Sequence, residues 1–153
     1  APGGALGLEP YLGPCRVVHA IGCGPLIEIE HVERAFGDAG DLPPRVLVRT
    51  AERALVDRWS DEFTAYAAST IAWLADRGVR LVGIDTPSVD PAASKELPSH
   101  QVLLARDVRV LENLVLDDVP EGDYELIALP LRLVDADASP VRAVLRELTA
   151  VPG

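Results

Sequence analysis

The chain has 153 residues, 48% of them apolar, which is enough for one domain with a packed core and excludes an intrinsically disordered protein. Its net charge of −10 argues against nucleic acid or an anionic membrane surface as a partner, because both bind basic patches. No apolar run approaches the roughly 18 residues that cross a bilayer, and the first residues do not have the pattern of a signal peptide. With only Cys15 and Cys23, we expect reduced thiols and a cytoplasmic protein.

The first part of the chain alternates loops with short regular elements. Residues 1–13 are rich in glycine and proline and predict a loop. A strand is predicted over residues 14–21, with His19 hydrogen-bonded in or beside the sheet. A short helix is predicted over residues 29–36, and we expect His31 on its solvent-exposed face.

The middle of the chain has the strand–helix–strand order of an α/β domain. The β-branched segment 45–50 predicts a central strand, and Arg49 at its end is either a structural ion-pair residue or part of a site. A helix is predicted to begin at Ser60 or Asp61 and to end at Gly78, which has the C′ position. A second buried strand follows over residues 79–85.

The last third contains four more predicted elements. A short helix over residues 97–105 is followed by a turn and an extended piece over residues 108–116. A long strand is predicted over residues 124–133, with Pro130 near an edge or a bulge. Ser139 and Pro140 have the residue types of a helix N-terminus, so a final helix is predicted over residues 139–148. Its predicted buried face comprises Val141, Val144, Leu145 and Leu148.

The strongest chemical signal lies in residues 99–118, which place His100 twelve residues before Glu112. Glu112 lies in an apolar run, where a carboxylate without a partner is costly. On one continuous helix the two side chains would point about 120° apart, but a break near residues 106 and 107 would let them converge. The two then form an ion pair, a buried hydrogen bond or part of a metal site.

A proline-rich loop after the second buried strand contains Asp85, Ser88 and Asp90. Side chains at such strand ends either orient the residues of a site or accept hydrogen bonds from amides of the turn. Both interpretations stay open for these three residues. The sequence has no G-x-S-x-G elbow and no glycine-rich phosphate loop.

Several segments together resemble the cyclase family of metal-dependent hydrolases, and in detail its bacterial kynurenine formamidases. The most specific are G-I-D-T-P-S-V-D (83–90) and A-L-P-L-R-L (128–133) followed by S-P-V-R-A-V-L (139–145). The similarity extends over nearly all of the chain. The resemblance implies a single domain over residues 1–153, with a swivelling β/β/α fold in which helices flank a mixed central sheet, and it implies a homodimer.

The resemblance also implies the site. His100 and Glu112 match two metal ligands of the family, Asp85 and Asp90 are candidates for orienting the ligands, and the implied metal is zinc, as two ions, or manganese. The main signature of the family, H-x-G-T/A-H-x-D-x-P-x-H, carries the remaining ligands and the proposed catalytic histidine. This signature is absent from the sequence, and we expect it before Ala1. His19 and His31 do not match it and receive no role.

The implied reaction is hydrolysis of N-formyl-L-kynurenine to L-kynurenine and formate in tryptophan catabolism. Three alternatives stay open. One is another amide or ester hydrolase of the family, the second is a catalytically incomplete, non-enzymatic fragment of the same fold, and the third is a plain α/β binding domain in which His100 and Glu112 form a structural pair.

Overall fold

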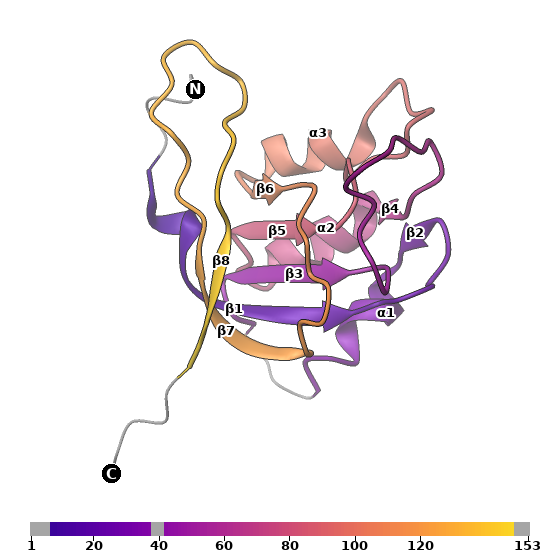
Figure 1. Cartoon of the computed structure of the whole chain (residues 1–153), viewed down its shortest axis with the longest axis horizontal. Coiled ribbons are helices and arrows are strands. Elements are labelled where there is room, and N and C mark those ends of the chain that lie inside the picture. The colour runs from indigo at the N-terminus through magenta and orange to yellow at the C-terminus, as the bar shows by residue number, and fades with distance from the viewer. Residues whose placement is uncertain (1–6, 38–41, 149–153) are drawn as a thin grey trace.

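A six-stranded mixed sheet forms the centre of the computed structural model, which describes residues 7–37 and 42–148 (Figure 1). The strand order is β6-β5-β3-β1-β7-β8. The strands are β1 (Leu12–His19), β3 (Arg45–Arg49), β5 (Leu81–Ile84), β6 (Arg109–Leu111), β7 (Gly122–Ile127) and β8 (Val144–Glu147). Neighbours among β6, β5, β3 and β1 pair in parallel, whereas β7 and β8 complete the sheet in antiparallel pairs. The predicted α/β class with a mixed central sheet is confirmed.

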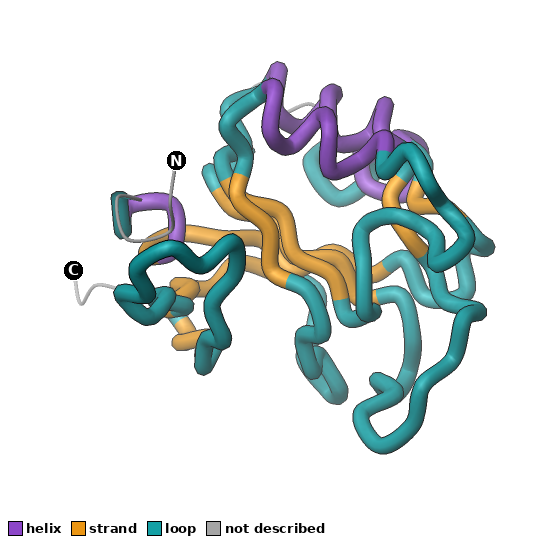
Figure 2. Tube along the Cα trace, turned by 90° about the horizontal axis from the view of Figure 1, so that it is seen from above, coloured by secondary structure: helices purple, strands orange, loops and turns teal. Residues whose placement is uncertain are grey.

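Helices cover one face of this sheet, and loops cover much of the other (Figure 2). The helices are α1 (Ile29–Glu33), α2 (Ala68–Asp76) and α3 (Pro98–Ala105), and a 3-10 helix, Glu9–Tyr11, precedes β1. A second, two-stranded parallel sheet joins β2 (Leu26–Ile27) to β4 (Ala65–Tyr66). In the part of the chain that the structure describes, no helix is long and apolar enough to cross a membrane.

The central strands are buried on both faces, which explains their nearly continuous apolar sequence. In β3, Val46 and Val48 pack into the core on the helical side, while Leu47 packs into a second core on the opposite face. β5 alternates in the same way, with Val82 on the helical side and Leu81 on the other. Each such side chain contributes about 1.5–3 kcal/mol relative to an exposed one, so β3 and β5 fix the centre of the fold.

The helix predicted to begin at Ser60 or Asp61 begins only at Ala68. The residues just before it are drawn into other pairings: Ala65 and Tyr66 form β4, and the buried Tyr66 hydroxyl donates a hydrogen bond to the Gly83 carbonyl. The predicted end of the helix is correct. Gly78 has φ +88°, and the Val79 amide donates to the Leu74 carbonyl across the turn.

The predicted final helix is wrong, because residues 144–147 form strand β8 against β7. The serine that was predicted to cap this helix has another partner, since the Ser139 hydroxyl accepts a hydrogen bond from the Leu131 amide. The long strand predicted over residues 124–133 also ends early, at Ile127. The intervening residues 129–143, which we call the arm, leave the body of the protein and return as β8 (Figure 1).

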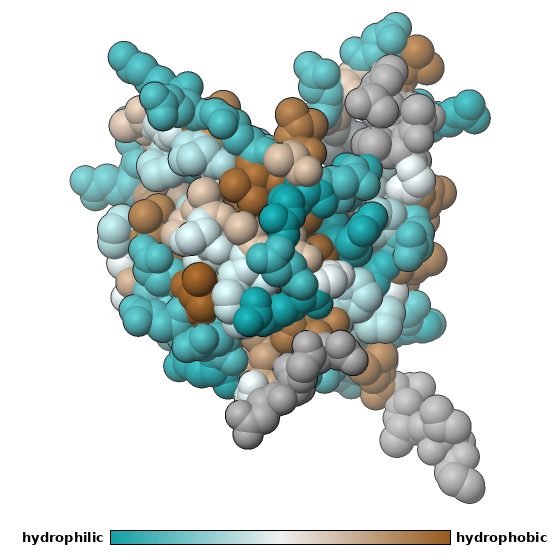
Figure 3. Space-filling model, turned by 180° about the vertical axis from the view of Figure 1, so that it is seen from behind, coloured by the Kyte–Doolittle hydropathy of each residue, from teal (hydrophilic) through white to brown (hydrophobic). Residues whose placement is uncertain are grey.

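The arm exposes apolar side chains. Leu129, Leu131 and Val134 are 42%, 55% and 78% exposed. Figure 3 shows hydrophobic atoms along this projection as well as on the body beside it. Pro130 lies in the arm beyond the end of β7, which fits its inability to donate a hydrogen bond to a sheet.

Candidate active site

His100 lies in the first turn of α3, where the chain enters the helix through a left-handed residue, Leu97 with φ +49°, and Pro98. Its imidazole is 38% exposed, and Nδ1 lies 2.7 Å from the Oδ2 atom of Asp90. A carboxylate accepts hydrogen bonds, so Nδ1 carries the proton and donates it to Asp90. In the neutral imidazole the second ring nitrogen, Nε2, then has a lone pair that is available to a ligand.

Asp90 is 1% exposed and holds the N-terminus of α3 from outside the helix. Its carboxylate accepts hydrogen bonds from the amides of Ser99 and His100, at 2.8 and 3.0 Å, in addition to the His100 ring. Burial raises the pKa of Asp90, but these hydrogen bonds together outweigh burial and lower its pKa below the ordinary value. Asp90 is therefore ionised and fixes both the backbone and the ring of His100.

Glu112 follows the last residue of β6 and faces His100. Its Oε1 atom lies 3.4 Å from His100 Nε2 and accepts a hydrogen bond of 3.0 Å from the Val89 amide. The side chain is 28% exposed, so it is less buried than its apolar neighbours in the sequence predict. The approach is that of an ion pair if the imidazole is protonated, and of two adjacent ligand atoms if it is neutral.

The predicted break between these residues exists. α3 ends at Ala105, and Asp107 takes a left-handed conformation with φ +52°, after which β6 begins at Arg109. The structure therefore brings His100 and Glu112 together, as their spacing predicts for a chain that breaks between them.

Asp85 lies elsewhere, immediately after β5. Its carboxylate, 6% exposed, accepts hydrogen bonds from the Thr50 amide, the Thr50 hydroxyl and the Ala51 amide. These bonds connect the carboxyl ends of β3 and β5. Asp85 thus stabilises the loop after β3, whereas Asp90 alone of the two candidate orienting residues contacts His100.

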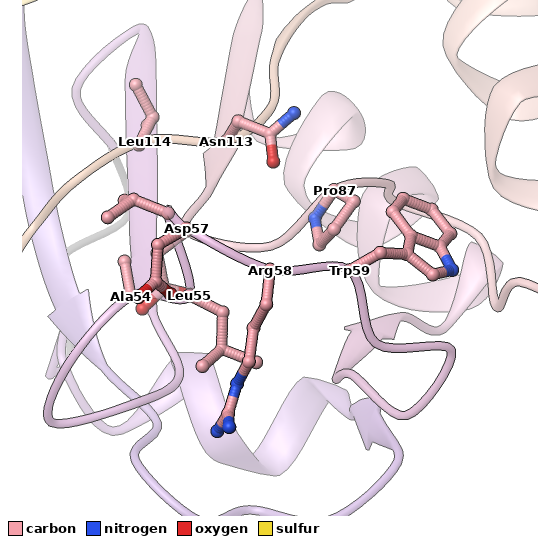
Figure 4. A pocket seen from close by; sticks show the side chains of 10 residues that line it. Ala54, Leu55, Asp57, Arg58, Trp59, Pro87, Asn113 and Leu114 are labelled. Atoms are coloured by element: carbon pink, nitrogen blue, oxygen red, sulfur yellow. The ribbon is translucent and has the colours of Figure 1, made fainter.

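A cleft of about 620 Å³ opens at these strand ends. Its lining includes Asp85 and Pro87, which follow β5, Asn113, which follows Glu112, and Arg58 and Trp59 from the loop after β3. In Figure 4, Asn113 and Leu114 lie across the cleft from Leu55 and Arg58. Open α/β sheets bind ligands at the carboxyl ends of their parallel strands, so this cleft is the candidate substrate site.

Sequence reasoning missed the cleft residues 54–59, to which it assigned neither an element nor a role. The available signal was a tryptophan next to an arginine, since aromatic and arginine side chains are enriched in binding sites.

The other candidates have structural partners. The predicted hydrogen bond of His19 beside the sheet is present, because its Nε2 lies 2.8 Å from the Val119 carbonyl oxygen. His31 Nδ1 accepts the Glu28 amide at the start of α1, which gives this histidine a structural contact on the helix surface. Arg49 donates to the carbonyls of Ala51 and Glu52. Burial raises the pKa of the Cys15 thiol to about 12, so Cys15 is a neutral core residue.

The described residues contain no group of three or more histidine, cysteine or acidic side chains placed to hold a metal ion. The described part of the candidate centre is therefore a pair, His100 and Glu112, supported by Asp90.

Comparison with known proteins shows the protein family to which this chain belongs. A family model described as "Putative cyclase" matches residues 4–91, and a solved "potential metal-dependent hydrolase with cyclase activity" superposes with a TM-score of 0.82 at 32% identity, over 95% of this chain and 70% of that one. A predicted metal-dependent hydrolase from Bacillus stearothermophilus gives a TM-score of 0.78, also at 32% identity, over 91% of this chain and 65% of that one. The chain belongs to the cyclase family.

Within the cyclase family, the chain is similar to several individual proteins. The chain is 70% identical to the kynurenine formamidase of Bordetella petrii over 145 residues, which is 95% of this chain and 68% of the relative. It is 64% identical to the kynurenine formamidase of Polaromonas naphthalenivorans over 146 residues, 95% of this chain and 63% of the relative. An isatin hydrolase, at 20% identity and a TM-score of 0.74 over 92% of this chain and 62% of that one, shares the fold.

Proposed function

We propose that this protein hydrolyses the formamide bond of N-formyl-L-kynurenine and releases L-kynurenine and formate in tryptophan catabolism. The observation that carries the proposal is 70% identity to a kynurenine formamidase over 95% of the chain. The contact between His100 Nε2 and Glu112 Oε1 supports it, because it brings together two side chains of the types that bind metal ions in hydrolases.

The donor chemistry fits a divalent transition metal. Asp90 accepts the Nδ1 proton of His100, so Nε2 of the neutral imidazole presents a lone pair, and a carboxylate behind a histidine ligand is common in zinc sites. Oε1 of Glu112 accepts one amide, and the carboxylate keeps further lone pairs. We assign zinc, as two ions, with manganese as the alternative, and His100 and Glu112 as the residues that would hold it.

The reaction places distinct demands on these side chains. When bound, the metal supplies Lewis-acid activation of water and of the formyl oxygen. His100 and Glu112 would hold it, and Asp90, which accepts the Nδ1 proton, keeps the imidazole in the tautomer that can bind. Catalytic zinc sites commonly use three protein ligands, so we assign the remaining ligands and the catalytic histidine to the family signature, H-x-G-T/A-H-x-D-x-P-x-H.

We further assign the protein to the cytoplasm and to a homodimer. The exposed leucines of the arm support an assembly, as does the outer edge of β8, which pairs with no further strand within residues 7–37 and 42–148, because an unpaired edge strand is a template for further pairing. Light scattering during size-exclusion chromatography measures the mass, and a monomer at micromolar concentration would contradict the dimer.

The metal assignment is tested with His100→Ala in the polypeptide as its gene encodes it. We expect zinc content, measured by elemental mass spectrometry, to fall and turnover to be lost, because Nε2 is the only histidine nitrogen that faces Glu112 among the described residues. His31→Ala is the matched control and keeps both. Unchanged zinc and unchanged turnover in His100→Ala would rule out the ligand role.

The substrate is tested by assaying N-formyl-L-kynurenine beside isatin and simple aryl esters. We expect the highest kcat/KM with N-formyl-L-kynurenine. Faster hydrolysis of another amide or ester would assign the protein to a different activity of the same family.

A further inference from the structure

We propose that Arg58 and Asp57 form a subsite for an amino-acid group, in which Arg58 binds the α-carboxylate of the substrate and Asp57 binds its α-ammonium group. The inference rests on the proposed function, since the amino-acid arm of N-formyl-L-kynurenine is the group that would occupy the subsite. It adds the residues that select this substrate over formamides without such an arm.

Asp57 and Arg58 lie in the lining of the cleft. So does Asn113, which directly follows Glu112 in the chain. In Figure 4 the Arg58 side chain extends away from Asn113, with its guanidinium at the far end. We place the formyl group at the His100–Glu112 pair and the rest of the substrate along this cleft, because Asn113 of the cleft lining is the next residue after Glu112. Asp57 and Arg58 offer opposite charges on neighbouring residues, and an amino-acid group carries opposite charges on neighbouring atoms.

The guanidinium group of Arg58 has no hydrogen-bond partner among the described residues. Over residues 7–37 and 42–148, neither Arg58 nor Asp57 makes a hydrogen bond or an ion pair with another side chain or with the backbone. The other two arginines of this region are occupied: Arg49 contacts Glu52, and Arg53 contacts Asp117 and Asp118. A guanidinium that lines a cleft and is left without a partner is matched to a carboxylate, because its planar donors fit two carboxylate oxygens at once.

Asp85, the other acidic residue that lines the cleft beside Asp57, does not oppose binding of a carboxylate at Arg58. Its own carboxylate is occupied by donors from Thr50 and Ala51. Arg58 is therefore the cationic group of the cleft lining, in a chain with 24 acidic and 14 basic residues. Among the side chains that line the cleft, Arg58 is thus the one that attracts an incoming carboxylate.

The aromatic neighbour fits the same substrate. Trp59 lines the cleft and is 71% exposed, and its ring packs edge-on against Phe63 at a centroid distance of 6.5 Å. An exposed indole face is a surface on which a substrate aryl ring stacks. The order along the loop is thus an acid, a base and an aromatic ring.

The experiment compares N-formyl-L-kynurenine with N-formylkynuramine, which has no α-carboxylate, in the full polypeptide encoded by the gene. We expect the wild-type protein to prefer the first substrate at least about tenfold in kcat/KM, through KM, which is the range of a charge-assisted hydrogen bond. In Arg58→Gln this preference falls to about onefold. Arg53→Gln is the matched control, because its guanidinium already has partners, and it keeps the preference.

Binding separates this inference from the proposed function. Quenching of tryptophan fluorescence by L-kynurenine and by kynuramine measures the subsite without turnover. Failure to hydrolyse either formamide would overturn the proposed function, whereas the subsite is overturned if Arg58→Gln binds L-kynurenine as the wild type does. For Asp57→Asn, we expect weaker binding of L-kynurenine but unchanged binding of its analogue that lacks the α-amino group. Equal changes for both ligands would remove Asp57 from the subsite.

Discussion

At the scale of single residues, Asp90 connects the helix to the candidate centre. Its buried carboxylate accepts hydrogen bonds from two backbone amides and from the His100 ring, so the position of the helix and the tautomer of His100 depend on one side chain. Such a residue acts through His100, and its effect is therefore measurable on the metal.

We expect Asp90→Asn to lower zinc affinity about 10–100-fold, the usual range for loss of a carboxylate behind a histidine ligand. The physical reason is that the carboxamide no longer accepts the Nδ1 proton with a full charge. Competition with a chelator measures the affinity. Asp76→Asn, at an exposed carboxylate on α2, is the control, and equal affinities in the two variants would show that Asp90 acts only on the fold.

Gly83 gives a second prediction at this scale. A Cβ atom at this position would lie 2.5 Å from Leu47 Cδ2 and 2.8 Å from Leu114 Cδ1, between β3 and the segment that follows Glu112. We expect Gly83→Ala to lower the free energy of unfolding by about 1–3 kcal/mol, the cost of overpacking a core. Denaturation by urea measures the change.

Gly7→Ala is the matched control, because a methyl group at that position would have nothing within 4 Å. Combining Gly83→Ala with Leu114→Ala should cost less than the sum of the two single changes, since the smaller side chain gives the new methyl group room. Strict additivity would show that the two positions do not compete for space.

At the scale of elements, residues 144–148 were predicted as part of a helix, whereas the structure has strand β8 over Val144–Glu147. As a strand, β8 alternates: Leu145 packs toward the second core opposite Leu126, whereas Val144 is 46% exposed. As a helix, Val144, Leu145 and Leu148 would share one buried face. Leu148 is in fact 56% exposed.

The strand therefore predicts that Leu145→Ala lowers the free energy of unfolding by about 1–2 kcal/mol, on the scale of a partly buried leucine. Val144→Ala and Leu148→Ala should each change it by less than about 0.5 kcal/mol, as exposed substitutions do. Urea denaturation of the three variants separates the possibilities, because similar losses at all three positions would favour the helix.

At the scale of the whole molecule, acidic residues outnumber basic ones. One of the arginines joins two strands that are far apart in the chain. Arg16 and Asp123 are register partners on β1 and β7, joined by hydrogen bonds of 2.7 and 2.9 Å. The hydrogen bond from Arg16 holds the pKa of Asp123 below its ordinary value of 3.8. This contact fastens the antiparallel end of the sheet to the parallel part.

The pH dependence of stability follows from the sign of that shift. A carboxyl with a lowered pKa in the folded state stabilises the fold fully above its unfolded value, and this stabilisation is lost as pH falls through the folded value. Asp90 has the same sign. We expect stability to be level from pH 7 to about 5 with respect to these groups and to fall below about pH 4.

Thermal unfolding between about pH 2.5 and 7 measures this profile. Asp123→Asn should flatten the acid limb relative to the wild type and lower stability at pH 7. A variant with the wild-type slope would show that the Arg16 contact does not contribute to acid sensitivity.

The sequence by itself determined the parts of this protein that local signals specify. Strands β1, β3 and β5 were predicted close to their observed bounds, and for β3 and β5 the reason is that strands buried on both faces are largely apolar. Helix α3, the break after it and the convergence of His100 with Glu112 were also predicted, since a histidine and a half-buried carboxylate at that spacing meet only across a turn. The resemblance to a family then added the metal.

Only the tertiary structure decided the features that depend on distant partners. The segments 65–66 and 144–147 became strands because β2 and β7 offer unpaired edges, and pairing with an edge outweighs a weak helical preference. The cleft around Arg58 arises in the same way, from a loop after β3 that meets the residues after β6. Contacts between residues that are far apart in the chain create these features, so no local pattern predicts them.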